Sequence, residues 1–273
     1  MRSYTPLRYP GGKAKLYSFV KNLIEKNFAD KPVYCEPFVG GAGLALKLLL
    51  TDVVTEVYIN DLDDAIYSFW YSLLNHKNDL VALINDTDIT IENWHIQKDI
   101  YENPERHTTL EKGFATFFLN RTNRSGIMKA GPIGGKKQNG NYKLDSRFNK
   151  ENLLVIIDTI YLYKDKIHIY KLDAKDFIST VDKKLDNTFI YLDPPYVEKG
   201  PELYKNSFTH KDHELLRNSV TQLKNKWFIT YDDSDYVEEL YKNYELDKFE
   251  LNYSVANARK GVEILIYGPG VNY

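Results

Sequence analysis

Thr188-Phe-Ile-Tyr-Leu-Asp-Pro-Pro-Tyr196 is the stretch of sequence that decides the fold. Its first five residues are apolar, aromatic or β-branched, which predicts a short buried strand. Pro194 and Pro195 cannot donate ladder hydrogen bonds, so the strand is expected to end before them. Asp193 and Tyr196 therefore lie on a stiff turn at the carboxyl end of a strand, where open α/β sheets place their sites.

The two side chains of this turn suit recognition of a nucleobase. The carboxylate of Asp193 can accept hydrogen bonds from an amine, and the ring of Tyr196 can stack on a flat base. Together they would hold a base by its exocyclic amino group. The same residues can also form a simple strand-ending turn, so their meaning depends on the sequence that precedes them.

Strands and helices alternate on both sides of this turn. Short apolar runs predict further strands at 33–38, 57–61, 167–173 and 227–231. Amphipathic stretches predict helices at 14–25, 42–50, 62–83 and 236–241, and Thr209 is the expected cap of another. This alternation predicts an α/β fold with a doubly wound, mostly parallel sheet. Two last strands, at 249–255 and 263–267, predict an antiparallel hairpin at the C-terminus.

The middle of the chain interrupts the alternation. Residues 91–101 and 110–119 are predicted helices with little strand signal between them, and 121–147 is polar, basic and rich in glycine. We therefore expect an inserted, mainly helical module at about 63–149.

The charge of the chain is unevenly distributed. The net charge is −2, but residues 121–150 hold eight Lys and Arg against Asp145 alone, a local charge of +7. This asymmetry favours a phosphate-binding patch on an otherwise acidic body. The alternative is a solvated loop whose charges only keep it soluble.

Several features of the sequence limit where the protein is expected to reside and which chemistry it is expected to use. The longest apolar runs are far short of a membrane span, and the first residues lack the apolar stretch of a signal peptide. The single cysteine, Cys35, lies in a predicted strand, where it is expected to act as a small hydrophobe, and it fits a reducing cytoplasm. His210 and His213 are expected on an exposed helix face, because no carboxylate or cysteine spacing supports a metal site.

Glu36-Pro-Phe-Val-Gly-Gly-Ala-Gly43 follows the first predicted strand and opens a helix. Such a glycine turn allows a ligand to approach the backbone closely, and the helix start offers amide donors. Asp61 ends the next strand, where an acid commonly binds the ribose hydroxyls of an adenosine. The spacing fits a nucleoside cofactor in general, so NAD stays an alternative, although the glycines do not form a clean G-x-G-x-x-G pattern.

Two further segments have both a functional and a structural interpretation. Tyr9-Pro-Gly-Gly-Lys13 precedes a helix and can hold an anionic group such as a carboxylate, or it is a simple turn with a surface lysine. Asn120-Arg-Thr-Asn-Arg-Ser-Gly126 carries side chains that can bind base edges bidentately, or it is a turn that bonds to itself.

Taken together, these segments resemble the Dam-like (D12 class) DNA adenine methyltransferases. The matching motifs lie at 9–13, 36–43, 59–61, 118–121 and 193–196, and the resemblance runs from residue 2 to about residue 267. It implies a Rossmann-like S-adenosylmethionine-dependent methyltransferase core. Residues 1–62 and 150–273 would form the catalytic domain, and 63–149 the target-recognition (DNA-binding) domain.

The resemblance also implies roles for individual residues. The catalytic positions are Asp193, Pro194 and Tyr196. The expected cofactor contacts are Tyr9, Gly12, Lys13, Glu36, Phe38, Gly40, Gly41, Asp61, Asp173 and Asp193. The expected DNA contacts, drawn from the basic insertion, are Asn120, Arg121, Asn123, Arg124, Lys136, Lys137, Lys143 and Arg147.

The implied reaction is transfer of a methyl group from S-adenosylmethionine to the exocyclic amino group of adenine in duplex DNA, by base flipping. The same turn would serve cytosine in DNA, adenine in RNA or a protein amide, although the basic insertion argues against a protein substrate. A non-catalytic DNA-binding regulator would need neither the acid, the ring nor the cofactor loop. A dehydrogenase function has still less support, because no segment of the sequence resembles a hydride-acceptor site.

The resemblance carries expectations about partners as well. We expect double-stranded DNA as the substrate, no metal, a monomer, and a location in the cytoplasm of a bacterial or phage-infected cell. A cognate restriction endonuclease is an open alternative. Residues 142–148 depart from the pattern of the branch that reads GATC, so the sequence assigns no recognition site.

Overall fold

The computed structural model describes residues 3–8, 13–197, 208–253 and 259–273. The strands are β1 (Val33–Glu36), β2 (Val57–Asn60), β3 (Ile167–Tyr170), β4 (Thr188–Leu192), β5 (Lys226–Asp232), β6 (Glu245–Tyr253) and β7 (Arg259–Tyr267). The α-helices are α1 (Tyr17–Asn27), α2 (Gly43–Leu50), α3 (Asp64–Asn75), α4 (Lys77–Asp86), α5 (Ile91–Glu102), α6 (Thr109–Thr122), α7 (Lys150–Tyr161), α8 (Ala174–Lys184), α10 (His210–Val220) and α11 (Asp235–Leu240). Short 3-10 helices are η1 (Lys13–Leu16), η2 (Pro104–Arg106), η3 (Arg124–Gly126), η4 (Leu144–Arg147) and η5 (Lys164–Lys166).

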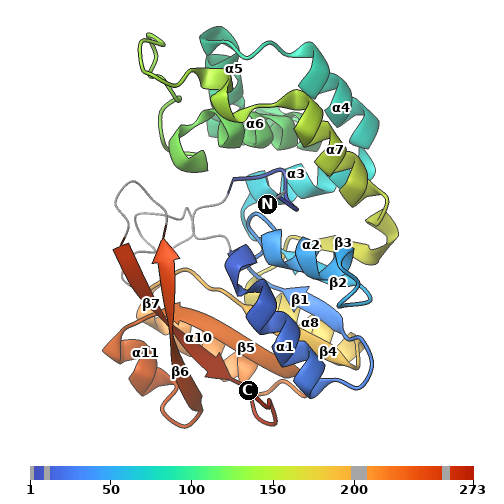
Figure 1. Cartoon of the computed structure of the whole chain (residues 1–273), viewed down its shortest axis with the longest axis vertical. Helices are drawn as coiled ribbons and strands as arrows, with labels where there is room; N and C mark the ends of the chain where they lie inside the picture. Colours follow the sequence, from blue (N-terminus) through green and yellow to red (C-terminus); the bar gives the residue numbers. More distant parts are fainter. Residues whose placement is uncertain (1–2, 9–12, 198–207, 254–258) are drawn as a thin grey trace. The chain divides into compact units, whose positions relative to one another are not determined.

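The described residues form two compact units. Residues 3–8, 40–46 and 64–165 make up unit 1, which is mainly helical and contains α3 to α7. The other described residues make up unit 2, which contains the whole sheet (Figure 1).

The sheet of unit 2 has the order β3-β2-β1-β4-β5-β7-β6. The first five strands in this order are parallel, and β7 pairs antiparallel with both β5 and β6 (Figure 1). The predicted doubly wound, mostly parallel sheet with a C-terminal antiparallel hairpin is therefore confirmed. The chain leaves β1 for β2 on one side and later adds β4 on the other, so the topological switch point, where α/β proteins bind ligands, lies between β1 and β4.

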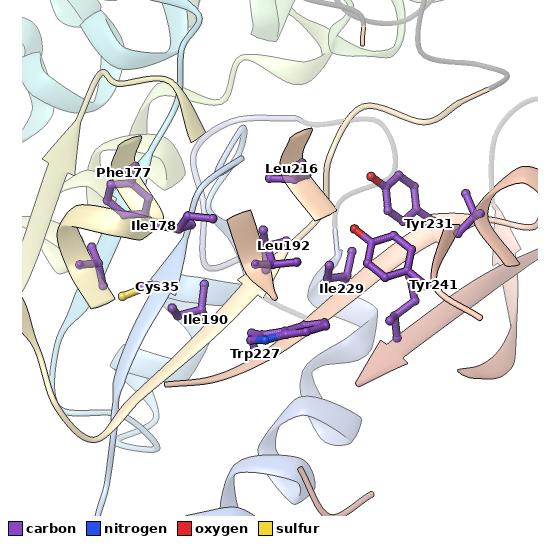
Figure 2. Packing of buried hydrophobic residues seen from close by; sticks show 14 of the residues in the cluster. Cys35, Phe177, Ile178, Ile190, Leu192, Leu216, Trp227, Ile229, Tyr231 and Tyr241 are labelled. Atoms are coloured by element: carbon purple, nitrogen blue, oxygen red, sulfur yellow. The ribbon is translucent and has the colours of Figure 1, made fainter. Parts of the chain in front are cut away.

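One face of the sheet carries the main apolar cluster of unit 2 (Figure 2). Side chains alternate between the two faces along a strand, so Ile190 and Leu192 of β4 lie on the same face as Ile229 of β5. Helices α8, α10 and α11 cover this face, with buried side chains such as Phe177 of α8 and Leu216 of α10. Each large apolar side chain buried here stabilises the fold by about 1.5–3 kcal/mol.

Cys35 of β1 belongs to the same cluster and is fully buried. It acts as the small apolar residue that the sequence predicted, and burial holds the pKa of its thiol well above the ordinary value. The described helices include none that is long and apolar enough to cross a membrane.

Helix α1 lies on the opposite face of the sheet. Its Phe19 contacts Phe228 of β5, with ring centroids 5.7 Å apart, and Phe228 in turn stacks on Tyr191 of β4 at 5.1 Å. Because alternate residues share a face, Thr230 of β5 also lies on this side, as does Tyr34 of β1. The polar residues on this face begin to build the site described below.

Unit 1 is built around α6. Phe117 of α6 stacks on Phe69 of α3, with ring centroids 5.7 Å apart. Gly113 allows the two helices to approach closely, since a Cβ atom there would lie 2.5 Å from the carbonyl oxygen of Ser68. After α6, residues 123–147 form loops, the 3-10 helices η3 and η4 and one isolated bridge between Asn123 and Pro132. Loops are what the polar, basic and glycine-rich composition of 121–147 indicates, although α6 continues to Thr122.

Unit 1 extends beyond the predicted end of the insertion at 149, because α7 packs with it. The side chains of Leu153, Ile157 and Ile160 are buried along one face of α7. The Lys150 ammonium donates to the carbonyl oxygen of Asn85 at 2.7 Å, which ties the start of α7 to the end of α4.

The single helix predicted for 62–83 is wrong. Two helices, α3 and α4, meet at His76, whose φ of −130° and ψ of 38° are not helical. Polar residues with modest helix propensity surround the break, and Leu80 and Ile84 of α4 bury a separate apolar face. Likewise, the helix predicted from 14 to 25 begins as the 3-10 turn η1 and becomes α-helical only at Tyr17.

His213 of α10 is buried, which corrects the expectation of an exposed histidine pair. It lies on the inner face of the helix with Leu216 and Val220, at the spacing that a buried helical stripe requires. Its Nδ1 lies 2.9 Å from the hydroxyl of Tyr231. His210 stays exposed, and no group of three metal-ligating side chains occurs among the described residues. The predicted cap of α10, Thr209, is confirmed.

Burial of His213 should make stability depend on pH. Burial lowers the pKa of His213 to about 4, whereas a histidine in the unfolded chain takes up a proton near about pH 6.5. The contribution of the buried, neutral His213 to the free energy of unfolding is therefore complete above about pH 6.5, and it is lost as the pH falls toward about 4. His213→Gln does not titrate, so the difference in unfolding free energy between the two proteins should shrink by up to about 2 kcal/mol from about pH 7 to about pH 4.5. Urea denaturation at both pH values measures it, and a constant difference would contradict the assignment.

Candidate active site

Asp193 follows the last residue of β4, at the carboxyl edge of the parallel strands. Its Oδ1 accepts a hydrogen bond from the Thr230 hydroxyl at 3.0 Å and lies 3.3 Å from the Lys13 ammonium. The hydroxyl of Thr230 is in turn 2.8 Å from that of Tyr191. Pro194, the next residue, is buried. The acid is thus fixed from two sides on a turn that the prolines stiffen.

Lys13, Tyr196 and Glu263 form a compact hydrogen-bonded triangle beside Asp193. The Lys13 ammonium donates to the Tyr196 hydroxyl and to Glu263 Oε1, both at 2.6 Å. The Tyr196 hydroxyl donates to the same carboxylate oxygen at 2.6 Å. Tyr196 is 9% exposed and Glu263 is 1% exposed, so the triangle is shielded from water. It fixes the tip of the Tyr196 ring and holds a positive charge next to Asp193.

The antiparallel direction of β7 explains how Glu263 reaches this edge. Glu263 is the middle residue of β7 and the first that pairs with β5, where it lies opposite Asp232, the last residue of that strand. A parallel strand would place its first paired residues at the opposite edge of the sheet. Alternation then directs Glu263 away from Ile264 and Ile266, which belong to the apolar cluster, and toward the face that carries Thr230.

Burial and charge together set the protonation of the site. Burial raises the pKa of Asp193 to about 6, an effect that the Lys13 ammonium opposes and the Glu263 carboxylate reinforces. For Lys13, burial would lower the pKa, but Asp193 and Glu263 more than offset it and hold the pKa above its ordinary value. Lys13 is therefore a cation. With both acids ionised, the cluster carries a net negative charge that suits a cationic ligand.

Three predicted cofactor residues of unit 2, all of them acids, lie at or just after the carboxyl ends of neighbouring parallel strands. Glu36 ends β1, is 4% exposed, and accepts a hydrogen bond from the Tyr34 hydroxyl at 3.3 Å. Asp61 follows β2, and its Oδ1 accepts from the backbone amide of Asp63 at 3.0 Å. Asp173 caps α8 after β3, accepting from the amide of Lys175 at 2.9 Å. The fold thus brings carboxylates from distant parts of the sequence to one sheet edge.

The glycine loop after β1 leads directly into α2. Val39 donates its backbone amide to the carbonyl of Asn60 at 3.0 Å, which fixes the start of the loop on the end of β2. Gly40 has a φ of 45°, in the left-handed region that favours glycine, and Gly41 follows it. Phe38 is half-buried and contacts the ring of Phe208 at 5.8 Å. Tyr9 and Gly12, the other predicted cofactor residues, lie outside the described residues.

The predicted DNA contacts all belong to unit 1. Five of them are exposed cations: Arg124, Lys136, Lys137, Lys143 and Arg147. Arg121 is half-buried and donates through Nε to the carbonyl of Arg147 at 2.6 Å. Burial, with the nearby charges of Arg8 and Arg147, lowers the pKa of Arg121 to about 10, so it stays protonated at neutral pH. Arg8 adds a further cation to this basic segment, because it donates to Asn120 and Asn123. Its position was not predictable from the sequence, since both partners lie more than a hundred residues away in the chain.

The roles expected of the amides of Asn120 and Asn123 are revised. Asn120 is 2% exposed and bonds to both the amide and the carbonyl of Arg8, at 2.7 and 2.8 Å. Asn123 is fully buried and accepts from the indole of Trp94 at 2.7 Å. Direct contact with bases would require these buried hydrogen bonds to break. Both amides are therefore used within unit 1. The segment also bonds to itself at one point, where Asn120 Nδ2 donates to the carbonyl of Gly126 at 3.1 Å.

The sheet order, the strand-end acids and the glycine loop define a Rossmann-like methyltransferase fold. The family model for the D12 class N6 adenine-specific DNA methyltransferases matches residues 9–255, and the chain belongs to this family. The protein is therefore an enzyme that methylates N6 of adenine in DNA, with S-adenosylmethionine as the methyl donor.

Curated relatives match over nearly the whole chain. The type II methyltransferase M1.LlaDCHI of Lactococcus lactis subsp. cremoris is 24% identical over 266 residues, covering 92% of this chain and 88% of the relative. The type II methyltransferase M.CviBI of Paramecium bursaria Chlorella virus NC1A is 26% identical over 277 residues, covering 94% and 95%. Among solved structures, the rRNA methyltransferase aviRa from Streptomyces viridochromogenes matches with a TM-score of 0.43 at 11% identity, covering 96% of this chain and 88% of that one.

The residues at the sheet edge fit the cofactor that the family implies. S-adenosylmethionine carries ribose hydroxyls, an amino group and a positive sulfur, and each of these groups suits a carboxylate neighbour. Glu36 and Asp193 are acids at the ends of β1 and β4, on the two sides of the topological switch point, and Asp61 lies at the end of β2. The donor set therefore matches the cofactor.

Proposed function

We propose that the protein methylates adenine at a specific sequence in duplex DNA and that Asp193, Pro194 and Tyr196 hold the flipped base. The observation that carries this proposal is the fixed turn after β4, where a carboxylate and an aromatic ring lie three residues apart at the switch point. Swinging a base out of the duplex costs a few kcal/mol. Stacking on the Tyr196 ring would offset about 1–3 kcal/mol of that cost.

The carboxylate of Asp193 and the carbonyl of Pro194 would accept the two hydrogens of the adenine amino group. The nitrogen lone pair, otherwise delocalised into the purine ring, is then free to point at the incoming methyl group. Both oxygens also stabilise the positive charge that develops on nitrogen. When bound, S-adenosylmethionine supplies an electrophilic methyl group on its sulfonium. The protein contributes alignment and electrostatic field, and no covalent intermediate on the enzyme is needed.

The proposed cofactor contacts in unit 2 are Lys13, Glu36, Phe38, Asp61, Asp173 and Asp193. Tyr9, Gly12, Gly40 and Gly41 complete the proposed set. We assign target recognition to the insertion that begins at residue 63 and the catalytic domain to the sheet-bearing part of the chain. A monomeric state and a cytoplasmic location stay predictions from the sequence. The type II relatives support proposing a restriction–modification role, with a cognate endonuclease as partner.

Expression in a bacterial host that lacks DNA methylation tests the proposed function directly. Sequencing of the host genome with detection of modified bases should find N6-methyladenine at one sequence context. Cells expressing Asp193→Ala at an equal protein level are the control and should show none. Modification of cytosine alone, or of RNA and not DNA, would overturn the proposal.

The exposed lysines of unit 1 should make DNA binding depend on salt. Each lysine that neutralises a phosphate contributes about −0.9 to the slope of log affinity against log salt concentration. Lys136→Ala/Lys137→Ala should therefore flatten this slope by up to about 2 and weaken binding to all sequences alike. Lys183→Ala/Lys184→Ala removes two adjacent exposed lysines from α8 of unit 2 and is the matched control. Equal slopes for both double variants, measured by fluorescence anisotropy, would remove Lys136 and Lys137 from the DNA interface.

A further inference from the structure

Glu263 is a buried acid that neither the sequence motifs nor the family match accounts for. It lies beyond residue 255, where the family match ends, and it is followed by apolar β7 residues such as Ile264, Leu265 and Ile266. An acid at such a position is costly to bury unless it is paired and hydrogen-bonded. Its role has therefore to be found in what it contacts.

The contacts of Glu263 point into the reaction site. Its Oε1 lies 2.6 Å from both the Lys13 ammonium and the Tyr196 hydroxyl. Lys13 in turn lies 3.3 Å from Asp193, and its ammonium is 5.1 Å from the centre of the Tyr196 ring. One carboxylate oxygen therefore connects the residue proposed to stack on the base with the cation beside the residue proposed to bind its amino group.

We propose that Glu263 is a positioning residue for methyl transfer: it fixes the orientation of the Tyr196 ring and shares the Lys13 ammonium with Asp193. This inference rests on the proposed function of Asp193 and Tyr196. Glu263 acts through these neighbours and has no assigned contact with the base. A neutral residue of the same shape would fill the space, but it would leave Lys13 with Asp193 as its remaining carboxylate in the cluster.

Removing the charge of Glu263 should alter both the Lys13–Asp193 ion pair and the hydrogen bond that holds the Tyr196 hydroxyl. Among the described residues, Lys13 would then keep Asp193 as its ion-pair partner, besides its hydrogen bond to the Tyr196 hydroxyl. The acid that must accept the adenine hydrogens would be tied more closely to Lys13. The hydroxyl of Tyr196 would exchange a charge-assisted hydrogen bond for a neutral one, which is about half as strong. The ring would be held less firmly in the orientation needed for stacking.

The pH dependence of the reaction separates positioning from a merely structural role. Methyl transfer needs the Asp193 carboxylate, so its rate should rise with pH through a midpoint set by the pKa of Asp193, about 6, and level off at higher pH. The Glu263 charge raises this pKa, and Lys13 lowers it. Loss of the Glu263 charge should therefore move the midpoint to lower pH. In the part of the chain that the structure describes, the charged and titratable groups around Asp193 are Lys13 of η1, Tyr34 of β1, Tyr191 of β4, Tyr196 after β4 and Glu263 of β7.

The test compares Glu263→Gln with Glu263→Asp in single-turnover methylation of duplex DNA across pH. Glu263→Gln should lower the rate by about 10–100-fold, the effect of one lost charged hydrogen bond, and shift the midpoint to lower pH. Glu263→Asp keeps the charge, so it should keep the midpoint while losing part of the rate. Asp247→Asn, an exposed acid on the neighbouring strand β6, is the matched control and should change neither quantity.

Unchanged rate and midpoint in Glu263→Gln would overturn the inference, as would a rate loss with no shift of midpoint. If Glu263→Gln does not fold, Glu263→Asp still decides, because wild-type kinetics in that variant would overturn the positioning role. Circular dichroism and DNA affinity report on the fold of each variant. Absence of DNA methylation by the wild-type protein would instead refute the proposed function, so the two failures are distinguishable.

Discussion

Asp193→Asn should lower the single-turnover rate of methyl transfer by about 10²–10³-fold, the usual effect of removing one group that stabilises transition-state charge. The substitution keeps the shape of the side chain but removes the negative charge that faces the developing cation on the adenine nitrogen. Fixed by Thr230 and Lys13, the carboxylate is organised before the reaction, so its loss should appear in the rate and not in substrate affinity.

The measurement is transfer of a labelled methyl group to duplex DNA at saturating cofactor, with DNA affinity measured in parallel. Asp186→Asn is the matched control, because Asp186 precedes the same strand but is 93% exposed and pairs only with Lys224 among the described residues. It should behave as the wild type does. A rate for Asp193→Asn within a few-fold of wild type would remove Asp193 from the reaction.

Tyr196→Ala should lower the rate by about 10–100-fold, since it removes the ring that stacks on the flipped base. Tyr196→Phe keeps the ring and loses the hydroxyl bonds to Lys13 and Glu263, so its loss should be smaller. A fluorescent adenine analogue at the target position reports the flipped population directly. The analogue should brighten with wild type and Tyr196→Phe, and less so with Tyr196→Ala.

A mismatched target base provides an internal check on the role of the ring. A mismatch lowers the cost of leaving the duplex, so it should rescue part of the defect of Tyr196→Ala. It should not rescue Asp193→Asn, whose defect lies after flipping. Equal effects of the mismatch on both variants would show that Tyr196 does not act through the flipped state.

The parts of the fold that are encoded locally were predictable from the sequence. The apolar run of β4 and the two prolines after it place Asp193 at a strand end without any knowledge of neighbours. The positions of Glu36 and Asp61 at strand ends were predictable in the same way, because each residue lies where a short apolar run stops. What decides these positions is contained within about ten consecutive residues.

The network around Asp193 was not predictable, because its members are joined only by tertiary structure. Lys13 and Glu263 are 250 residues apart in the chain. Thr230 gave no signal beyond its strand, although its alternation with Ile229 places it on the polar side. An acid among apolar residues of a strand, as in Glu263-Ile-Leu-Ile266, is the kind of local inconsistency that could have indicated a buried partner.

Residues whose burial depends on packing were misjudged for the same reason. Asn123 and His213 are polar and were expected to face solvent or DNA, yet both are fully buried with a specific partner. In the case of His213, the helical spacing with Leu216 was visible in the sequence and indicated an inner face.

The pairing of β7 with β5 has a consequence for how the chain can be altered. Side chains in a strand change face at every residue, so a shift of the pairing by one position would exchange Glu263 for Ile264 at the edge beside Asp193. An insertion or deletion within the terminal hairpin should therefore abolish methylation even where the rest of the enzyme folds normally. If Glu263 acts as proposed, strand β7 belongs to the catalytic apparatus, and engineered changes should leave its pairing with β5 intact.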